Sequence, residues 1–405
     1  MDIRPILSTL LRHKTAATLI VLEIALSCAI ICNAIFLITT RLERGERPTG
    51  LAETELVSIQ MAGIGRSDDP DALVKRDLAA LRAIPGVKAA TSTNQVPFGG
   101  SSSNSSISLE PDQLNPTANA SVYLADEGLL DTFGLKLVEG RWFNSDEFLD
   151  YGVLDDPGPE TPISATVLTR SLAERLFPGE SAIGKSIYSW GEAPTRVVGV
   201  VEYLMRPNDI GGPAENQFSF ILPIRPTFGT YGLRTAPERR AEVLEAAIEA
   251  LGQVNPRRIV IWDRTFAEMA SDYYRQDRAM AGMLLAMIIA LLVVTALGIV
   301  GLASFWVAQR TKQIGVRRAL GATRGQVLRY FQTENFLLAS FGIVLGMLGA
   351  YGLNQFLMGQ YEMERLPAIY LPLGAVALWL LGQVAVFGPA RRAAAVPPAV
   401  ATRSV

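Results

Sequence analysis

The chain has 405 residues, of which 49% are hydrophobic and only 19% are charged, and its mean hydropathy is +0.24. Soluble globular proteins carry about a quarter charged residues, so this composition argues against an ordinary soluble enzyme. One histidine, His13, and two cysteines, Cys28 and Cys32, exclude a histidine-based metal site and a disulfide framework. The sequence therefore predicts a non-catalytic membrane protein that carries a soluble insert.

Four stretches lack charge or nearly lack it, and each is long enough to span a membrane. Residues 15–40 are interrupted only by Glu23, whereas 279–309, 335–361 and 366–390 contain no charged residue. A helix crosses the hydrocarbon core with about 20 apolar residues, so we predict four transmembrane helices. The first run is too long for the core of a signal peptide and is interpreted as a retained span.

The charges of the connecting segments predict the orientation. Residues 310–334 contain six arginines or lysines and one acid, whereas the loop before the last span has Glu362, Glu364 and Arg365. Basic loops stay in the cytoplasm, which places 310–334 and both termini there. Residues 41–278 are then expected on the outer side of the membrane.

The outer segment, residues 41–278, predicts an α+β domain with two subdomains. It holds 24 basic and 34 acidic side chains, a balance that argues against nucleic acid as a partner. Strand-like and helix-like stretches alternate along it. Within it we predict a mobile loop over the Gly/Ser/Asn-rich residues 99–121. A helix over 265–278 is expected to lead into the second span as a stalk.

One pattern in this segment imitates a nucleotide site. Residues 179–186, G-E-S-A-I-G-K-S, satisfy the phosphate-loop pattern literally. A working phosphate loop lies between a strand and a helix, whose N-terminus faces the phosphates. Here a predicted helix and Pro178 precede the pattern and a strand-like run, 187–190, follows it. We therefore interpret it as a structural turn.

The segment after the second span is the most informative one. Residues 310–320 predict a short basic helix, which Gly321 ends. Thr323 and Gln326 form a capping-box pattern that restarts a helix leading into the third span. Such an elbow either docks on a partner or rests on anionic lipid as an amphipathic helix, and periodicity alone leaves both alternatives open.

Two polar residues lie inside the first predicted span, Glu23 and, one turn later, Ser27. A charged group in hydrocarbon costs at least about 2.5 kcal/mol, so Glu23 is expected to face protein, water or a partner span. It is either a gating or dimer-contact residue or a neutral, hydrogen-bonded structural one.

Small residues in the spans predict close packing. Cys28 and Cys32 are spaced for a soft-metal pair, but packing is the favoured interpretation. Gly342, Gly346 and Gly349 would permit close approach of another helix to the third span.

Three motifs carry a resemblance to a known family. The elbow, R-T-K-Q-I-G-V-R-R-A-L-G-A-T over 310–323, is similar to the motif of FtsX/MacB-type ABC transporter permeases. Residues 176–187 and 196–201 resemble the MacB periplasmic core pattern, and the tail from Pro389 also matches. The resemblance covers the whole chain.

The resemblance implies a permease subunit of the bacterial inner membrane that dimerises with an identical or a paralogous chain. A dimer of cytoplasmic ATPases, supplied as a separate chain, would bind ATP and Mg²⁺, while this chain binds no cofactor. Movement would pass to the periplasmic domain by mechanotransmission, for efflux of antimicrobial peptides or lipophilic substrates, with a periplasmic adaptor as a further partner. The alternative is an FtsX-like regulator that activates a periplasmic cell-wall hydrolase.

The residues implied to dock on the ATPase form the coupling helix of this family; they are Ile314, Gly315, Val316, Arg317, Arg318, Leu320 and Gly321. The predicted organisation is a cytoplasmic segment 1–14, a first span 15–40, a periplasmic domain 41–278, a second span 279–309, a coupling elbow 310–334, spans 335–361 and 366–390, and a cytoplasmic tail 391–405.

Overall fold

The structure, a computed structural model, describes residues 14–64, 69–100, 102–154, 163–189, 193–208, 217–361 and 365–397. The chain forms two compact units, one of Met1–Gly45 with Gln276–Val405 and one of Glu46–Arg275. We call them the helical unit and the outer unit and describe each by itself. The expectations on 1–13, on Glu362 and Glu364 and on the last eight residues of the tail lie outside the described residues.

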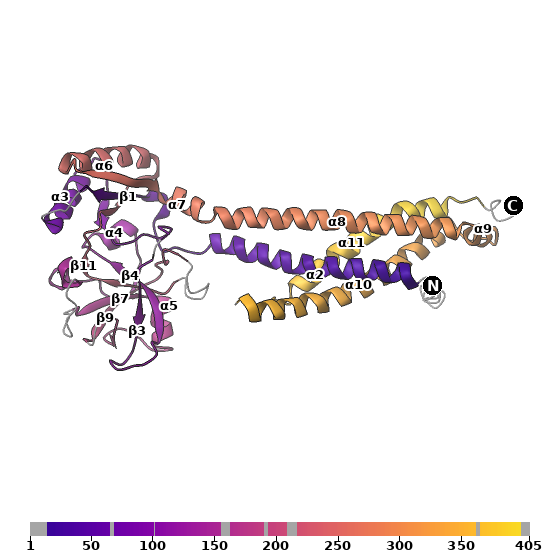
Figure 1. Ribbon diagram of the computed structural model, residues 1–405, viewed down its shortest axis with the longest axis horizontal. Coiled ribbons are helices and arrows are strands. Elements are labelled where there is room, and N and C mark those ends of the chain that lie inside the picture. Colours follow the sequence, from indigo (N-terminus) through magenta and orange to yellow (C-terminus); the bar gives the residue numbers. More distant parts are fainter. Residues whose placement is uncertain are drawn as a thin grey trace. The chain divides into compact units, whose positions relative to one another are not determined.

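The helical unit contains the long apolar helices. In the described part of the chain, four helices are long and apolar enough to cross a membrane (Figure 1). They are α2 (Lys14–Gly45), α8 (Arg275–Gln309), α10 (Arg324–Tyr361) and α11 (Tyr370–Ala394). A short helix, α9 (Thr311–Ala319), connects α8 to α10. At about 1.5 Å per residue, the 35 residues of α8 extend over roughly 52 Å, more than the hydrocarbon core requires.

Glycines bring α10 against α2, as the sequence predicted. A Cβ atom on Gly342 would lie 2.8 Å from Ile24 Cβ, and one on Gly346 would lie 2.5 Å from Cys28 Cβ. Both distances are too short for a side chain, so only glycine permits this approach. At Gly349 the nearest atom would be 3.7 Å away, an ordinary contact.

The two cysteines belong to the same helix interface. Cys28 and Cys32 are buried and free, with sulfur atoms 4.0 Å apart. Their thiols lie 3.9 Å from the carbonyl oxygens of Ile343 and Leu371, on α10 and at the start of α11. No group of three metal-ligating side chains occurs among the residues described. These contacts favour the packing interpretation of the two thiols.

One layer of the outer unit is an antiparallel sheet covered by two helices. Its strands, in spatial order, are β13 (Arg258–Thr265), β1 (Leu56–Gly63), β12 (Thr230–Arg234) and β2 (Ala89–Ser92). The helices α3 (Pro70–Arg82) and α6 (Arg240–Val254) pack on it through a shared apolar core (Figure 1). Asp69 caps α3 by accepting a hydrogen bond from the Ala72 amide at 2.9 Å, and Pro70 occupies the first helical position.

The second layer is a mixed sheet. Its described strands, in spatial order, are β3 (Asn104–Ile107), β4 (Ala118–Leu124), β10 (Ser219–Leu222), β7 (Ala165–Thr169), β9 (Thr195–Val201) and β5 (Leu137–Gly140), with β8 (Ser186–Ile187) also paired to β9. The β4–β10 and β7–β9 pairs are parallel and the others antiparallel. The remaining elements are β6 (Leu149–Asp150), β11 (Ile224–Arg225), α4 (Leu129–Phe133), α5 (Arg170–Leu176), α7 (Phe266–Tyr273) and 3₁₀ turns at Glu53–Glu55, Ser145–Glu147, Tyr151–Leu154 and Pro237–Arg239.

Two local predictions for the outer unit are wrong. Residues 99–121 are not a loop throughout, because Asn104–Ile107 pair with β4 as an edge strand. The helix expected over 265–278 is interrupted at Tyr274. The rings of Tyr273 and Tyr274 pack within 5.5 and 5.8 Å of the Phe98 ring, which draws the chain out of the helical path.

The phosphate-loop imitation is a turn between α5 and β8 (Ser186–Ile187), in agreement with its interpretation as a structural element. Gly179 and Gly184 adopt φ values of +73° and +81°, which favour glycine. Lys185 is ion-paired with Glu180, and its Nζ atom lies 4.6 Å from the centre of the Phe177 ring. The lysine thus has local partners in place of a phosphate. Trp190, expected in the following strand, lies outside the described residues.

Candidate functional site

The elbow between α8 and α10 ends α9 with a fixed backbone turn. Gly321 has a φ of +96°, a conformation that side-chain-bearing residues rarely adopt. The Gly321 amide donates to the Arg318 carbonyl at 3.1 Å and the Ala322 amide to the Arg317 carbonyl at 3.0 Å. This pair of bonds is the Schellman motif, which satisfies the last carbonyls of α9.

The start of α10 is equally well defined by the sequence. The Gln326 amide donates to Thr323 Oγ1 at 3.2 Å, and the Thr323 amide donates to Gln326 Oε1 at 2.9 Å. These reciprocal bonds form the predicted capping box. The Schellman motif and the capping box leave only a short connection between α9 and α10, so the elbow has little freedom to rearrange.

The residues predicted to dock on an ATPase do not share one environment. Val316 and Leu320 are 48% and 83% exposed, and Arg317 is also exposed. Ile314 and Gly315 are buried; Ile314 packs in a small core that α9 forms with α10 and the end of α11. Gly321 is exposed, but its part is the backbone turn.

Arg318 holds α9 to the end of α11. Its Nη1 atom donates to the carbonyl oxygens of Ala394 and Val396, at 2.9 and 2.8 Å. A cationic donor satisfies carbonyls at the C-terminus of a helix, where the partial charge is negative. Arg318 therefore contributes to the rigidity of the elbow rather than to its free surface.

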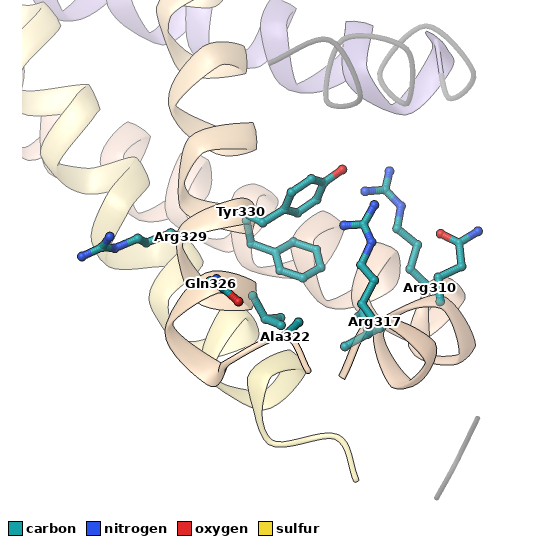
Figure 2. A pocket seen from close by; sticks show the side chains of 10 residues that line it. Arg310, Arg317, Ala322, Gln326, Arg329 and Tyr330 are labelled. Carbon is teal, nitrogen blue, oxygen red and sulfur yellow. The ribbon is translucent and has the colours of Figure 1, made fainter. Parts of the chain in front are cut away.

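A cleft of about 490 Å³ lies between α9 and the first turns of α10 (Figure 2). It is lined by polar, basic and aromatic residues of both helices: Arg310, Gln313, Ile314, Arg317, Ala322, Gln326, Val327, Arg329, Tyr330 and Phe331. Arg317 places its guanidinium 5.0 Å from the centre of the Tyr330 ring, a cation–π contact.

A buried ion pair next to this cleft was not predicted from the sequence. Arg310 Nη1 donates to both carboxylate oxygens of Glu334 at 3.0 Å, and the two side chains are only 9% and 2% exposed. The pair fastens the end of α8 to α10. The sequence signal was the single acid among six basic residues in 310–334, although nothing in it identified which base would be the partner.

The polar residues of the first span face α8. Ser27 Oγ lies 2.8 Å from Thr295 Oγ1, within hydrogen-bond distance. Glu23 is half-buried, and its carboxylate lies so close to Gly298 that a Cβ atom there would be 2.5 Å from Glu23 Oε2. Near the other end of α2, Arg41 is ion-paired with Asp277 of α8. We call this row of contacts the α2–α8 polar seam.

Comparisons with known proteins identify both parts of the chain. The model of the MacB-like periplasmic core domain matches residues 17–251, more than half of the chain. The model of the FtsX-like permease C-terminal domain matches residues 285–398. This chain belongs to the MacB/FtsX family of ABC transporter permeases. As predicted, the permease has transmembrane helices and a large α+β domain between the first and second of them.

Among curated proteins, the permease is 27% identical over 347 residues to the macrolide export ATP-binding/permease protein MacB of Pasteurella multocida, with 82% of this chain and 50% of that protein covered. It is 22% identical over 422 residues to the uncharacterized ABC transporter permease YknZ of Bacillus subtilis, with 99% and 98% covered. The permease thus spans about half the length of the MacB relative.

Two solved structures also match. The extracellular domain of the YknZ transporter has a TM-score of 0.33 at 15% identity, covering 51% of this chain and all of that one. The periplasmic region of MacB from Actinobacillus actinomycetemcomitans has a TM-score of 0.34 at 18% identity, covering 52% and 90%.

Proposed function

We propose that this permease couples ATP hydrolysis by a separate cytoplasmic ATPase to movement of its periplasmic domain. The observation that carries the proposal is the construction of α9. It is a short helix with exposed apolar residues, Val316 and Leu320, and it is held to the neighbouring helices through Arg318 and the core around Ile314. A rigidly held helix with a free apolar face transmits force from a partner that binds that face.

Charge supports the proposed orientation. Within the described residues, the six basic side chains of 310–334 include only one, Arg310, that forms an ion pair. The other five give the elbow a positive charge that favours the cytoplasm. Both termini would then be cytoplasmic, with residues 41–278 in the periplasm of a bacterial inner-membrane protein.

The remaining partners and the cargo follow from the family. We infer a dimer of permease chains, identical or paralogous, on a dimer of ATPases that bind ATP and Mg²⁺, so that the permease itself is not catalytic. The name of YknZ, a permease matched over nearly its whole length, supports a separate ATPase. The name of MacB, a macrolide export protein, supports efflux of lipophilic or antimicrobial substrates. We infer a periplasmic adaptor as a further partner.

The test replaces both exposed apolar residues of α9, in the variant Val316→Glu with Leu320→Glu. We expect at least a tenfold loss of the ABC ATPase that co-purifies with the tagged permease from its native host, because two carboxylates would be buried at the contact. Leu114→Glu is the matched control, since Leu114 is 97% exposed in the outer unit. Undiminished co-purification by the double variant would remove α9 as the docking element. Arg318 is left intact because its replacement would release α9 from α11.

A further inference from the structure

We propose that the cleft between α9 and α10 binds the phosphate group of an anionic membrane lipid, held between Arg310 and Arg317. The proposal concerns the permease alone and does not depend on ATPase docking.

The side chains of the cleft are arranged for an anion. Figure 2 shows the guanidinium ends of Arg310 and Arg317 pointing to the same side of the cleft, near the ring of Tyr330, whereas Arg329 points away from them. The volume of about 490 Å³ lies within the range of roughly 300–1,000 Å³ usual for small-ligand sites.

One nitrogen of the Arg310 guanidinium, which lines the cleft, has no hydrogen-bond acceptor among the residues described. Its side chain is 9% exposed, and its Nη1 atom is engaged by Glu334, but its Nη2 atom is buried without a hydrogen-bond partner. Buried donors are nearly always satisfied, because leaving one unpaired forfeits its hydration. A ligand oxygen in the cleft would supply the missing acceptor.

Arg317 adds a second charge without a counter-ion. Its cation–π partner Tyr330 is neutral, and no described residue forms an ion pair with it. Glu334 accepts two hydrogen bonds from Arg310. The two guanidinium groups and one carboxylate leave the site positive, and a phosphate offers several oxygens to both arginines at once.

The position of the cleft along the helices favours a lipid as the source of the phosphate. Arg310 directly follows the uncharged run 279–309, and Tyr330 precedes Asn335, where the next run begins, by five residues. Five helical residues rise about 7.5 Å, which is the thickness of one headgroup layer. Trp306, one turn inside Arg310, and Tyr330 are residue types enriched at that depth.

Side chains that do not line the cleft are available for a protein partner. Arg310, Gln313, Ile314 and Arg317 follow the helical spacing of three and four along the cleft side. Val316 and Leu320, the exposed apolar residues, do not line the cleft. A lipid in the cleft and a protein bound to Val316 and Leu320 therefore do not compete for the same side chains.

The experiment measures stabilisation of the purified full-length permease in neutral detergent. Unfolding is followed by a fluorogenic maleimide, which reacts with Cys28 and Cys32 when they become exposed. Phosphatidylglycerol, phosphatidylcholine and inorganic phosphate are titrated separately. We expect phosphatidylglycerol to raise the unfolding midpoint by about 5 °C at roughly 100 times its Kd, and the other two to raise it by less than about 1 °C.

Arg317→Gln should remove most of the shift, while Lys312→Gln, which deletes one exposed charge of the same helix, should retain it. Native mass spectrometry counts bound phosphatidylglycerol as a second measurement. The proposal is overturned if Lys312→Gln loses the shift equally, if phosphatidylcholine acts equally, or if inorganic phosphate alone reproduces it. It is also overturned if Arg317→Gln keeps the shift but loses the co-purifying ATPase, which would assign the cleft to an acidic protein segment.

Discussion

Replacing Gly346 by alanine is expected to destabilise the helical unit by forcing α10 away from α2. The added Cβ atom would lie 2.5 Å from Cys28 Cβ, 2.6 Å from the Ala25 carbonyl oxygen and 3.1 Å from Ala25 Cα. Two of these atoms belong to the backbone and the third, Cys28 Cβ, is bonded directly to it. None of them can move away by a change of side-chain rotamer. Carbon atoms prefer about 3.5–4.0 Å, and the helices would have to separate by about 1 Å.

The free-energy cost of this clash can be taken from other cores into which an extra group has been inserted. Inserting a methyl group into a packed core costs about 1–3 kcal/mol. For a unit of this size each kcal/mol lowers the midpoint by about 2–4 °C, so we expect the clash to lower it by roughly 2–12 °C. Gly352→Ala is the matched control, because a Cβ atom there has no neighbour within 4 Å. It carries the same change in helix propensity, so the difference between the variants isolates the clash.

The assay uses the two native thiols, which are buried and are the only cysteines of the chain. The temperature at which a fluorogenic maleimide reacts with them reports loss of the helix interface. Because Gly346 itself faces Cys28, the monodisperse peak in size exclusion after heating serves as a readout independent of the thiols. If Gly346→Ala and Gly352→Ala unfold at the same temperature by both measures, α2 and α10 do not approach as closely as described.

Three further outcomes are expected. Arg258→Ala should destabilise the outer unit by about 3–5 kcal/mol in urea unfolding, because it leaves the fully buried Asp77 carboxylate without its bidentate partner at 2.5 and 2.6 Å. The Arg141 guanidinium, at 2.7 Å, holds the pKa of Glu147 below its ordinary value. Above pH 4.3 the wild type should therefore be more stable than Glu147→Gln, by less than about 1 kcal/mol. This difference in stability should vanish as the pH falls through the lowered pKa of Glu147. Ala319→Cys should resist an impermeant maleimide applied to intact spheroplasts.

Each of these outcomes has a control. Arg257→Ala, an exposed neighbour, should change stability by less than about 0.5 kcal/mol, and a similar loss in both variants would contradict the role of the buried pair. A constant difference between wild type and Glu147→Gln from pH 7 to pH 3 would contradict the ionic contribution. Asp112→Cys, exposed in the outer unit, should react with the maleimide, and equal labelling of Ala319→Cys would reverse the proposed orientation.

The sequence predicted those parts of the fold that local chemistry decides. Long uncharged runs become helices because their length and composition allow little else, and all four did. The end of α9 and the start of α10 were predicted from Gly321, Thr323 and Gln326, because these caps depend only on neighbouring residues. In contrast, β3 could not be predicted within a Ser/Asn-rich stretch, since its only support is the partner strand β4. Tyr274 interrupts a helical pattern because of a ring contact with Phe98, far away in sequence.

The same division applies to the candidate site. The basic character of α9 was visible in the sequence, but the environment of each side chain was not. Arg317 and Arg318 are neighbours, yet one lines a cleft and the other binds carbonyls of Ala394 and Val396. Ile314, expected to be free for docking, is covered by residues of α11. Such differences depend on which helix, distant in sequence, packs beside α9. Helical periodicity does not predict that neighbour.

Under the proposed function, the contacts of α8 determine how a movement of α9 would spread through the helical unit. Only 17% of the most apolar segment of α8 is buried, against 50% for α2, so α8 has less apolar contact with its neighbours than α2 has. It is also held at three polar points: Asp277 to Arg41, Thr295 to Ser27, and Arg310 to Glu334. Breaking a buried ion pair or hydrogen bond leaves an uncompensated polar group, so each of these points resists displacement. A force on α9 would therefore pass through Arg310 to α8 as a whole, and the α2–α8 polar seam would carry α2 with it toward the segment where both helices join the outer unit.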